Sequence, residues 1–594
     1  MRRSKKLTAG LLILAMLISL CSCAGSRRKG AEIEKSPEAS KPETEVETEW
    51  TDQLPTDYPS PTPTIITEFK MFAGIVNKEI DKDNEIQKMI TEITGVKVTE
   101  SWLPENTTLK SAVDSITASG VYPDFINAFE ENIELYKKGA LIAWDDYLEQ
   151  YPDLKSLYTD EQWDMFRQED GHIYWANVFE RYNEKNTSTI HNGQAFWIQV
   201  RVLEAYGYPK VETLDQYFEL LEKYAKEHPE MPDGTKVIPY TCQAKDWKNF
   251  CLVLPPMMLD GYPNNQCVNV NTDEGMDKPK VSDYNVSDTA KAYYKKLNEE
   301  YKKGIIDKDF ASQTYDQYIE KLCTGAVLGL CDEYWDFAYN LMSYDLNKEG
   351  KDGSTYTLSE IGCNYVPLGL TIKPGMKQQW HTYEESIDIS SGIAVTVSCK
   401  DPDKAFKFLN ALLSQPVHDL RFWGVKDVDY LVDDEGKYYR TPEMRMNWNN
   451  PAYIAKHVCE YSYLPQWKGM SKDGINNMRP SEQPSEFMAT LPIPVQKCFK
   501  AYGASNYVEF IGSEYKTDYG KWFPLWSWSN NLNAKTDYGK AWTDIVKYRE
   551  SACPELVIAK NFDNAWKNYV SGYNKCGPDV FLKEAQAEVE RRMG

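Results

Sequence analysis

The sequence predicts an α/β fold built from short strands and amphipathic helices. From Ile65 onward, β-rich segments and segments with helical periodicity follow one another at short intervals. Alternation this close is typical of a mostly parallel sheet covered by helices. The chain has 594 residues, of which 42% are hydrophobic, so it can bury a large core and is long enough for two or more domains.

The first 26 residues have the pattern of an export signal. A basic region comes first, with Arg2, Arg3, Lys5 and Lys6. The apolar run from Leu7 to Leu20 is too short to remain as a membrane-spanning helix. Leu20-Cys21-Ser22-Cys23 resembles the bacterial lipobox, in which a small residue precedes the modified cysteine. This resemblance implies a signal peptide of residues 1–22 and lipidation of the Cys23 thiol. The alternative is an ordinary secretory signal with incidental cysteines.

Residues 23–64 are predicted to form a disordered tether. They contain seven glutamates, followed by a Pro/Thr tract over residues 59–63. A segment with so few apolar residues cannot offset the conformational entropy that it would lose on folding. We expect the tether to hold the folded region, residues 65–594, clear of the membrane.

The first part of the folded region predicts strands and helices in strict alternation. Strands are expected at 65–73, 96–98 and 122–126. Amphipathic helices are expected at 84–94, 109–120 and 133–138, each followed or ended by a glycine that can stop it.

The later part predicts longer helices and two buried strands. Thr213-Leu214-Asp215-Gln216 is a capping box that begins a helix. The other expected elements are a helix ending at Gly304, continuous apolar strands at 325–330 and 392–397, a helix from Asp401-Pro402 and a last helix from about Pro578. We find no internal repeat.

The charge balance excludes one class of partner. The chain has 89 acidic and 67 basic residues, and its formal net charge is −22 at pH 7. Nucleic acid is therefore not an expected partner, because its phosphates would be repelled. After the export signal no apolar run approaches the length of a spanning helix. We expect the mature protein on the extracellular face of the cell membrane, anchored by lipid rather than embedded.

Cysteines, histidines and aspartates predict no metal site. Eleven cysteines follow Cys23 at scattered spacings without a C-x-x-C pair, so we expect mostly buried thiols, with one or two disulfides left open. The six histidines form no His-x-x-x-His pair. A group of four aspartates lacks the spacing of an EF-hand and is predicted to be a solvated hairpin: Asp427, Asp429, Asp433 and Asp434.

No catalytic motif stands out in the sequence. G-x-S-x-G, the Walker A loop and a G-x-G-x-x-G after a strand are all missing. We therefore predict a protein that is not an enzyme and that has no cofactor. The carboxylate pair of a glycosidase leaves no local signature, so this argument is incomplete by itself.

Short motifs along most of the mature chain resemble one family in their order and spacing. They are Gly120-Val121-Tyr122-Pro123-Asp124-Phe125, Gly139-Ala140-Leu141-Ile142, Asp170-Gly171-His172-Ile173-Tyr174, Gly207-Tyr208-Pro209, Gly325-Ala326-Val327 and Asp403-Lys404-Ala405-Phe406. With the lipobox, they resemble the extracellular solute-binding proteins of ABC carbohydrate importers. Phe422-Trp423-Gly424-Val425 resembles the larger Gram-positive lipoprotein members. Trp144 and Trp175 depart from the family pattern, which leaves the ligand open.

The resemblance implies a two-lobed periplasmic-binding-protein-like fold of type II, with a hinge between the lobes and a ligand cleft. The lobes would interleave, the first starting with 65–180, the second mainly 181–390, and C-terminal helices over 400–594. It also implies a lipid-anchored receptor that captures an oligosaccharide, closes around it and delivers it to ABC transporter permease subunits. We expect a monomer.

A sugar site needs polar side chains beside aromatic rings, because a saccharide presents both hydroxyls and an apolar ring face. The 17 Trp and 40 Tyr could supply such rings. In the first lobe we expect Asp124 and Asn127 at the carboxyl end of a strand. Trp175 and Asn177 follow the 170–174 hairpin and are expected to reach the cleft.

In the second lobe, Glu333 and Trp335 follow the buried 325–330 strand and should emerge at its edge. Trp526 and Trp528 would lie on the same side of any extended segment and could form a stacking platform. Tyr262 belongs to a loop that could reach the ligand. For each of these residues, a core or capping role is the alternative.

Two other functional classes stay open at this point. A surface glycoside hydrolase or lyase would require a close carboxylate pair in the cleft. A binding protein for peptides or another small solute would need a different lining. An anion receptor is disfavoured by the net charge of −22.

Overall fold

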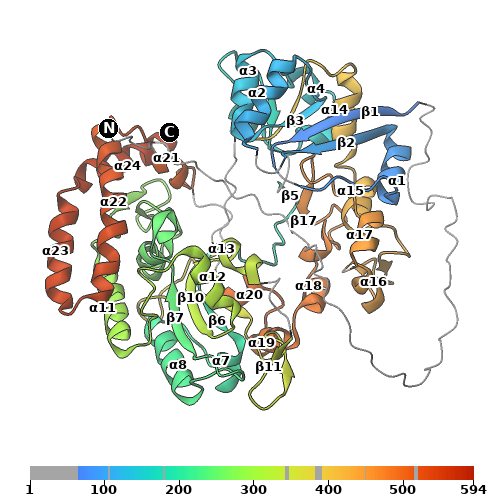
Figure 1. The fold of residues 1–594 in the computed structure, drawn as a ribbon. Coiled ribbons are helices and arrows are strands. Elements are labelled where there is room, and N and C mark those ends of the chain that lie inside the picture. The colour runs from blue at the N-terminus through green and yellow to red at the C-terminus, as the bar shows by residue number, and fades with distance from the viewer. Residues whose placement is uncertain are drawn as a thin grey trace, which may run out of the picture. The chain divides into compact units, whose positions relative to one another are not determined.

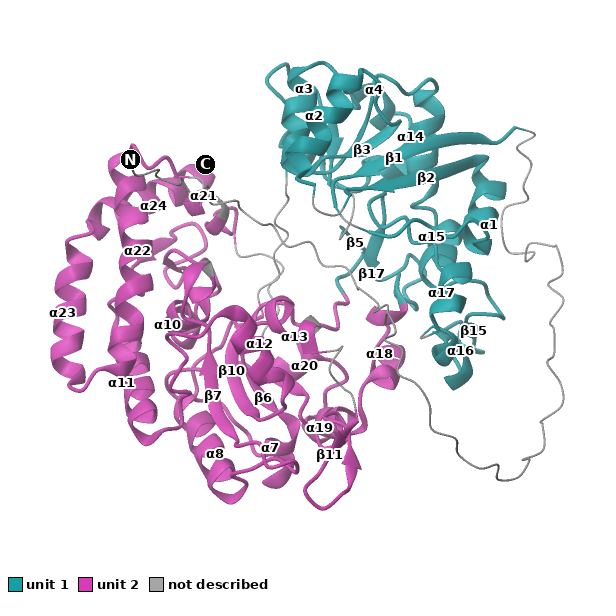
Figure 2. Cartoon of the chain, viewed as in Figure 1, with its two compact units in different colours: residues 1–186, 387–479 teal, residues 187–386, 480–594 magenta. Residues whose placement is uncertain are grey.

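The computed structural model describes residues 65–75, 77–104, 107–177, 181–341, 347–381, 389, 391–448, 450–513, 520–530 and 532–593. The predicted signal peptide, Cys23 and the predicted tether lie outside these described residues. The chain divides into two compact units (Figure 1; Figure 2). Unit 1 comprises residues 1–186 and 387–479, and unit 2 comprises residues 187–386 and 480–594. The chain therefore passes between the units three times.

Unit 1 contains these strands: β1 (Thr67–Ala73), β2 (Val96–Trp102), β3 (Phe125–Asn127), β4 (Trp175–Ala176), β5 (Arg181–Asn183), β14 (Ile393–Val395), β15 (Leu431–Val432), β16 (Tyr438–Tyr439) and β17 (Trp467–Gly469). Its helices are α1 (Glu85–Thr94), α2 (Leu109–Ser119), α3 (Asn132–Lys137), α4 (Asp145–Leu148), α5 (Pro152–Lys155), α6 (Asp160–Asp164), α14 (Pro402–Ala411), α15 (Gln415–Phe422), α16 (Pro442–Asn447) and α17 (Pro451–His457).

Unit 2 contains these strands: β6 (Gln194–Gln199), β7 (Ile238–Cys242), β8 (Asn269–Asn271), β9 (Lys280–Ser282), β10 (Val327–Glu333), β11 (Lys348–Glu349), β12 (Thr355–Tyr356) and β13 (Tyr365–Leu368). Its helices are α7 (Val200–Ala205), α8 (Leu214–Glu227), α9 (Phe250–Val253), α10 (Pro255–Leu259), α11 (Asp288–Lys303), α12 (Tyr315–Cys323), α13 (Tyr334–Leu341), α18 (Pro484–Thr490), α19 (Ile493–Tyr502), α20 (Tyr507–Ile511), α21 (Trp526–Asn530), α22 (Asp537–Ile558), α23 (Phe562–Asn574) and α24 (Pro578–Met593).

The sheet of unit 1 has the strand order β2-β1-β3-β14-β4. β1 pairs in parallel with β2 and β3, whereas β14 is antiparallel to β3 and β4. The prediction of a mostly parallel sheet is therefore right for the first three strands only. The physical reason is the chain path, because β14 enters the sheet after the chain returns from unit 2, and not through a βαβ crossover.

The sheet of unit 2 has the order β13-β6-β10-β7. β10 is parallel to β7 and antiparallel to β6, and β13 is antiparallel to β6. This sheet is mixed as well. Its strands are almost wholly buried, since helices cover it, and Trp197 of β6 and Leu330 of β10 are both 0% exposed.

Local signals place the helix ends where the sequence predicts them. The Asn84 side chain accepts a hydrogen bond from the Gln87 backbone at the start of α1, and Gly95 ends the helix with φ 70°. Thr213 and Gln216 form both hydrogen bonds of the predicted capping box. These caps satisfy backbone groups that would otherwise have no partner within the helix.

The thiols are packed in the interior. Of the eleven cysteines after Cys23, ten are buried and Cys576 is half-buried, and all of them are free thiols. The expectation of buried thiols is confirmed for these residues. Across the described ranges, each helix is too short or too polar to cross a lipid bilayer.

Candidate functional site

In each unit, parallel strands end together at one end of the sheet. We call this end, where the strands have their carboxyl termini, the edge of that unit. In open α/β sheets, ligands bind outside the carboxyl ends of the strands, because loops and helix starts converge there. In unit 1 this edge is formed by β1, β2 and β3, and in unit 2 by β10 and β7. The candidate residues fall into two separate groups, one at each edge.

At the unit 2 edge, three strands each carry a polar side chain. β10 ends at Glu333, whose partner in the antiparallel register is Gln194, the first residue of β6. On the other side of β10, Cys331 pairs with Cys242 at the end of β7, and Gln243 follows directly. The pairing register therefore brings Gln194, Glu333 and Gln243 to one edge.

Aromatic rings lie beside these polar groups. Trp335, in the first turn of α13, donates its indole N–H to the Glu333 carboxylate. The Trp335 and Phe250 ring centroids are 6.1 Å apart, and the Phe250 carbonyl accepts a 3.2 Å hydrogen bond from Gln194. Lys248 forms an ion pair with Asp336. We call Gln194, Gln243, Lys248, Phe250, Glu333 and Trp335 the unit 2 edge site.

The buried carboxyl group of Asp332 lies next to the unit 2 edge site, at the end of β10. Asp332 is 0% exposed, and it accepts hydrogen bonds from the Tyr318 hydroxyl at 2.7 Å and the Cys251 thiol at 3.1 Å. Burial raises the pKa of Asp332 well above its usual range, and the neighbouring Asp336 charge raises it further. The Asp332 carboxyl is therefore neutral at pH 7, and it fixes the end of β10 without adding charge to the site.

One atom of each of two side-chain amides at the unit 2 edge lacks a hydrogen-bond partner among the described residues. Gln194 Oε1 and Gln243 Nε2 are enclosed, and neither has a partner among the residues that the structure describes. An enclosed polar atom without a partner costs about 1–3 kcal/mol. A water molecule or a ligand hydroxyl that reaches these atoms would recover that cost.

The unit 1 edge combines an amide with three rings. Trp102 ends β2 and Asn127 ends β3. The Tyr463 ring lies 5.8 Å from Trp102 and 6.0 Å from Phe129, in edge-to-face contact with both. Asn127 accepts a 3.2 Å hydrogen bond from the Phe129 backbone, and Phe129 has the unusual φ of 47°. We call Trp102, Asn127, Phe129 and Tyr463 the unit 1 edge site.

The predicted position of Asp124 needs correction. Asp124 precedes β3, at the amino end of the strand, whereas the sequence argument put it at the carboxyl end. Its carboxylate accepts a 2.8 Å hydrogen bond from the Lys70 backbone. The error arises because the strand begins at Phe125 and not at Tyr122, so Asp124 and Asn127 lie at opposite ends of the same short strand.

Trp175 and Asn177 lie at the end of the unit 1 sheet. Trp175 is in β4, is only 2% exposed and donates its indole N–H to the Ile389 carbonyl at 3.0 Å. In this structure its ring therefore packs in the core. Asn177 follows β4, and its Oδ1 is enclosed without a partner among the described residues.

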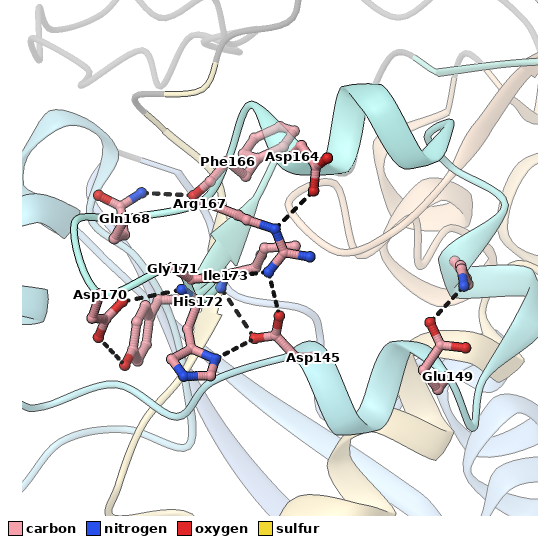
Figure 3. A network of polar contacts seen from close by, with 12 residues as sticks. Asp145, Glu149, Asp164, Phe166, Arg167, Gln168, Asp170, Gly171, His172 and Ile173 are labelled. Carbon is pink, nitrogen blue, oxygen red and sulfur yellow. Dashed lines mark hydrogen bonds and ion pairs between the residues drawn. The ribbon is translucent and has the colours of Figure 1, made fainter.

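A polar network holds the hairpin that leads to Trp175 (Figure 3). Asp145 at the start of α4 accepts hydrogen bonds from Arg167 at 2.5 Å and from the Ile173 backbone at 3.2 Å, and it pairs with His172 at 3.1 Å. Asp170 accepts a 2.8 Å hydrogen bond from the Tyr174 hydroxyl. These contacts join the 170–174 hairpin to the start of α4, so in this structure the family-like motif makes structural contacts within unit 1.

The three remaining predicted residues are in unit 2. Tyr262 is half-buried, and its hydroxyl accepts a 3.3 Å hydrogen bond from Asn271. Trp526 and Trp528 belong to α21, and Trp528 stacks on Phe581 at 5.9 Å. The expectation of two indoles on one side of an extended segment is wrong, because residues two apart on a helix point in different directions.

A separate pocket of about 380 Å³ lies within unit 2. Tyr334, Phe337 and Ala338 of α13 line one wall, and Phe487 and Tyr507 line another. Its lining contains none of the predicted site residues. α13 thus packs one face on this pocket, while its first turn supplies Trp335 to the unit 2 edge site.

The described residues provide no group of three or more His, Cys, Asp or Glu side chains that could hold a metal ion. The four aspartates that were predicted to lie in a solvated hairpin differ in their exposure to solvent. Asp433 and Asp434 are exposed in the β15–β16 turn. Asp429, by contrast, is 0% exposed and accepts a 2.5 Å hydrogen bond from the Tyr453 hydroxyl, so the solvated reading is wrong for this residue.

Several edge residues escape the sequence analysis. Gln194 is the first residue of β6 and Gln243 directly follows β7, and neither strand was among those expected from the sequence. Trp102 could have been found, because it is the last residue of β2. The sequence analysis predicted this strand but ended it at residue 98. Phe129 and Tyr463 carry no local signal, since they come together only through the fold.

Comparison with known proteins supports the fold assignment. No protein-family model matches the chain, and no curated protein matches it. Among solved structures, a solute-binding protein from Bifidobacterium longum infantis, described as HMO-binding and associated with an ABC transporter, covers 88% of this chain and 99% of its own, with 15% identity and a TM-score of 0.54.

Two further solved structures agree with this match. The Streptococcus pneumoniae ABC-transporter substrate-binding protein FusA, in complex with kestose, covers 88% of this chain and 99% of its own, with 18% identity and a TM-score of 0.53. An extracellular solute-binding protein from Bifidobacterium longum subsp. infantis covers 90% and 100%, with 14% identity and a TM-score of 0.54. The chain therefore has the two-lobed α/β fold of these solute-binding proteins.

Proposed function

We propose that this protein is a lipid-anchored extracellular receptor that captures an oligosaccharide and delivers it to an ABC transporter permease. The observation that carries the proposal is the unit 2 edge site, where Trp335 is held by Glu333 beside two glutamine side chains. The solved structures with this fold include proteins described as HMO-binding or bound to kestose, which supports a carbohydrate ligand.

The chemistry of the edge sites suits a sugar. A sugar hydroxyl both donates and accepts hydrogen bonds, and it can therefore pair with carboxylate, amide oxygen and amide N–H alike. The apolar face of a pyranose ring can stack on Trp335 in unit 2 or on Trp102 in unit 1, both of which are half-buried. Neither edge site requires a metal or a cofactor for such contacts.

A ligand screen tests the proposal directly. The protein from residue 65 onward is titrated with monosaccharides and oligosaccharides, and its thermal unfolding midpoint is recorded with each. A receptor is stabilised by about 2.7 kcal/mol at a hundredfold excess of ligand over Kd. Recovery of the glycan intact supports a receptor, whereas cleaved glycan identifies a carbohydrate-active enzyme. No shift with any sugar contradicts the carbohydrate assignment, and peptides are then screened.

Trp335→Ala is expected to weaken binding of the identified glycan about tenfold or more, because the stacking surface is lost. Trp102→Ala tests the unit 1 edge site in the same way. Tyr439→Ala is the matched control, because Tyr439 is an aromatic residue of β16 that is 37% exposed and lies outside both edge sites. Isothermal titration gives the affinities. If both tryptophan variants bind like the control, the edge sites are not the sugar site.

Cys23→Ser is expected to release the protein from the membrane into the medium. In the lipobox-like Leu20-Cys21-Ser22-Cys23 motif, Cys23 is the thiol expected to carry the lipid because the small residue Ser22 precedes it, and a serine hydroxyl is not a substrate for that modification. Cell fractionation and mass spectrometry of the mature N-terminus provide the measurement. Cys21→Ser serves as the control and should remain anchored. Retention of the Cys23→Ser variant in the membrane fraction would rule out this anchor.

A further inference from the structure

The pocket of about 380 Å³ in unit 2 offers no charged group to an occupant. Its described lining consists of apolar, aromatic, thiol, hydroxyl and amide side chains, and none of them is acidic, basic or a histidine. An ionised ligand group buried here would lose its water without gaining a partner of opposite charge, which is strongly unfavourable. The pocket therefore selects an uncharged occupant.

Aromatic rings make up much of the pocket wall. Five of the described lining residues carry such rings: Tyr334, Phe337, Tyr365, Phe487 and Tyr507. The ring centroids of Tyr334 and Tyr507 are 5.8 Å apart, and those of Phe487 and Tyr507 are 6.0 Å apart. Rings that contact one another in this way provide flat apolar surfaces, and an aromatic occupant can pack against them.

Several polar groups of the lining are already paired within the protein. The Thr490 hydroxyl donates a 2.8 Å hydrogen bond to a backbone carbonyl of its own helix, α18. The Tyr365 hydroxyl donates at 2.6 Å to a backbone carbonyl of β10, and the Asn364 amide donates at 3.3 Å to the Ser359 hydroxyl. A sugar residue carries several hydroxyls, and each one left unpaired in the pocket would weaken binding. The pocket is therefore poorly suited to a sugar.

We propose that this pocket is a second binding site, which takes a small uncharged aromatic molecule with one hydrogen-bonding group, such as an indole or a phenol. Tyr507 indicates the single group, because its hydroxyl makes no hydrogen bond with the residues that the structure describes. A cavity of about 150 Å³ can bind benzene, so about 380 Å³ has room for a two-ring molecule. This inference is independent of the proposed function.

Isothermal titration with small aromatic probes provides the first test. Indole and p-cresol are expected to bind saturably at one site and to raise the thermal unfolding midpoint. A matched pair tests the selection against charge, since 4-methylbenzyl alcohol and 4-methylbenzoate have nearly the same size and only the second is ionised at pH 7. The carboxylate is expected to bind at least tenfold more weakly than the alcohol.

Ala338→Leu fills the pocket from α13. Ala338 lines the pocket one helical turn after Tyr334 and is 8% exposed, so leucine adds an isopropyl group where the occupant would lie. Indole affinity is expected to fall at least tenfold. Ala565→Leu is the matched control, because Ala565 is a half-buried residue of α23 in the same unit and does not line the pocket. The unfolding midpoint without ligand shows that each variant is folded.

Tyr507→Phe removes one oxygen atom and tests the hydrogen bond. The probes are p-cresol and p-xylene, which differ only in a hydroxyl in place of a methyl group. The ratio of p-cresol to p-xylene affinity is expected to fall at least threefold, while the affinity for p-xylene stays as in the wild type. Tyr301→Phe is the control, since Tyr301 is a half-buried tyrosine of α11 outside the pocket lining.

The outcomes separate this inference from the proposed function. If no neutral aromatic probe binds, or if Ala338→Leu binds indole like the wild type, the inference is overturned and the sugar receptor is untouched. Equal binding of the carboxylate overturns the selection against charge, and an unchanged ratio in Tyr507→Phe overturns the role of its hydroxyl. Displacement of indole by an oligosaccharide shows that the pocket belongs to the sugar site, which also overturns the inference. A screen in which only the aromatic probes bind supports it and contradicts the proposed function.

Discussion

Glu100→Gln is expected to raise the thermal unfolding midpoint at pH 8 and to change it little at pH 5. Glu100 belongs to β2 in unit 1 and is 7% exposed. Burial raises the pKa of its carboxyl to about 8, and the Arg421 charge offsets this only in part. Its Oε1 atom is enclosed without a hydrogen-bond partner among the described residues, which agrees with a neutral carboxyl.

The direction of the pH effect follows from proton binding. An unfolded glutamate releases its proton near pH 4.5, whereas folded Glu100 keeps its proton until about pH 8. Between these values the folded state binds one proton more than the unfolded state, so its stability falls as the pH rises. Across the whole window this loss is of the order of 3–5 kcal/mol. Glutamine carries no proton to lose, so the variant should show a flatter profile.

Scanning calorimetry from pH 5 to pH 8 measures this effect. Glu92→Gln is the matched control, because Glu92 is exposed on the neighbouring helix α1 and should leave the profile as in the wild type. The buried carboxyl of Asp419, whose pKa burial raises to about 7, contributes in the same direction and remains in both variants. A Glu100→Gln profile as steep as that of the control would show that Glu100 is charged in the folded protein at neutral pH.

Arg421→Met is expected to destabilise unit 1 by about 3–5 kcal/mol. Arg421 is 0% exposed, and its guanidinium donates five hydrogen bonds to backbone carbonyls. Two go to Glu460, at 2.9 and 2.7 Å, and the others to Leu412, Pro465 and Tyr461. Methionine fills similar space but leaves these carbonyls buried and without their donor.

Arg167→Met gives the surface comparison. Arg167 pairs instead with two carboxylates, those of Asp145 and Asp164, and its side chain is 38% exposed (Figure 3). Water can replace such contacts, so we expect a loss of about 1 kcal/mol or less. Denaturant unfolding followed by tryptophan fluorescence measures both variants. Equal losses would mean that the Arg421 hydrogen bonds add little beyond those of an exposed ion pair.

The parts of the fold that depend on neighbouring residues could be predicted from the sequence. Asn84, Gly95 and the Thr213 capping box mark helix ends through hydrogen bonds within a few residues. Glu333 and Trp335 could be predicted for the same reason, since they directly follow an apolar strand. Whether they bind ligand is still a prediction.

The parts that depend on long-range pairing could not be predicted. Gln194 and Glu333 become neighbours only through the register of β6 with β10. Trp102 and Tyr463 meet because segments from both parts of unit 1 fold together. The predicted position of Asp124 was wrong for a smaller reason. The strand begins three residues later than predicted, and in a short strand this shift moves a side chain from one end to the other.

The position of β14 has a consequence for the order in which the protein can fold. β14 lies between β3 and β4 in the sheet, yet the whole of residues 187–386 precedes it along the chain. As the chain is made from its N-terminus, β3 has an open edge and β4 has no partner in the sheet until Ile393–Val395 has been added. Unpaired strand edges invite aggregation, and such distant pairing is slow. Completion of unit 1 therefore waits for all of residues 187–386, and completion of unit 2 waits in turn for residues 480–594, which follow unit 1 along the chain.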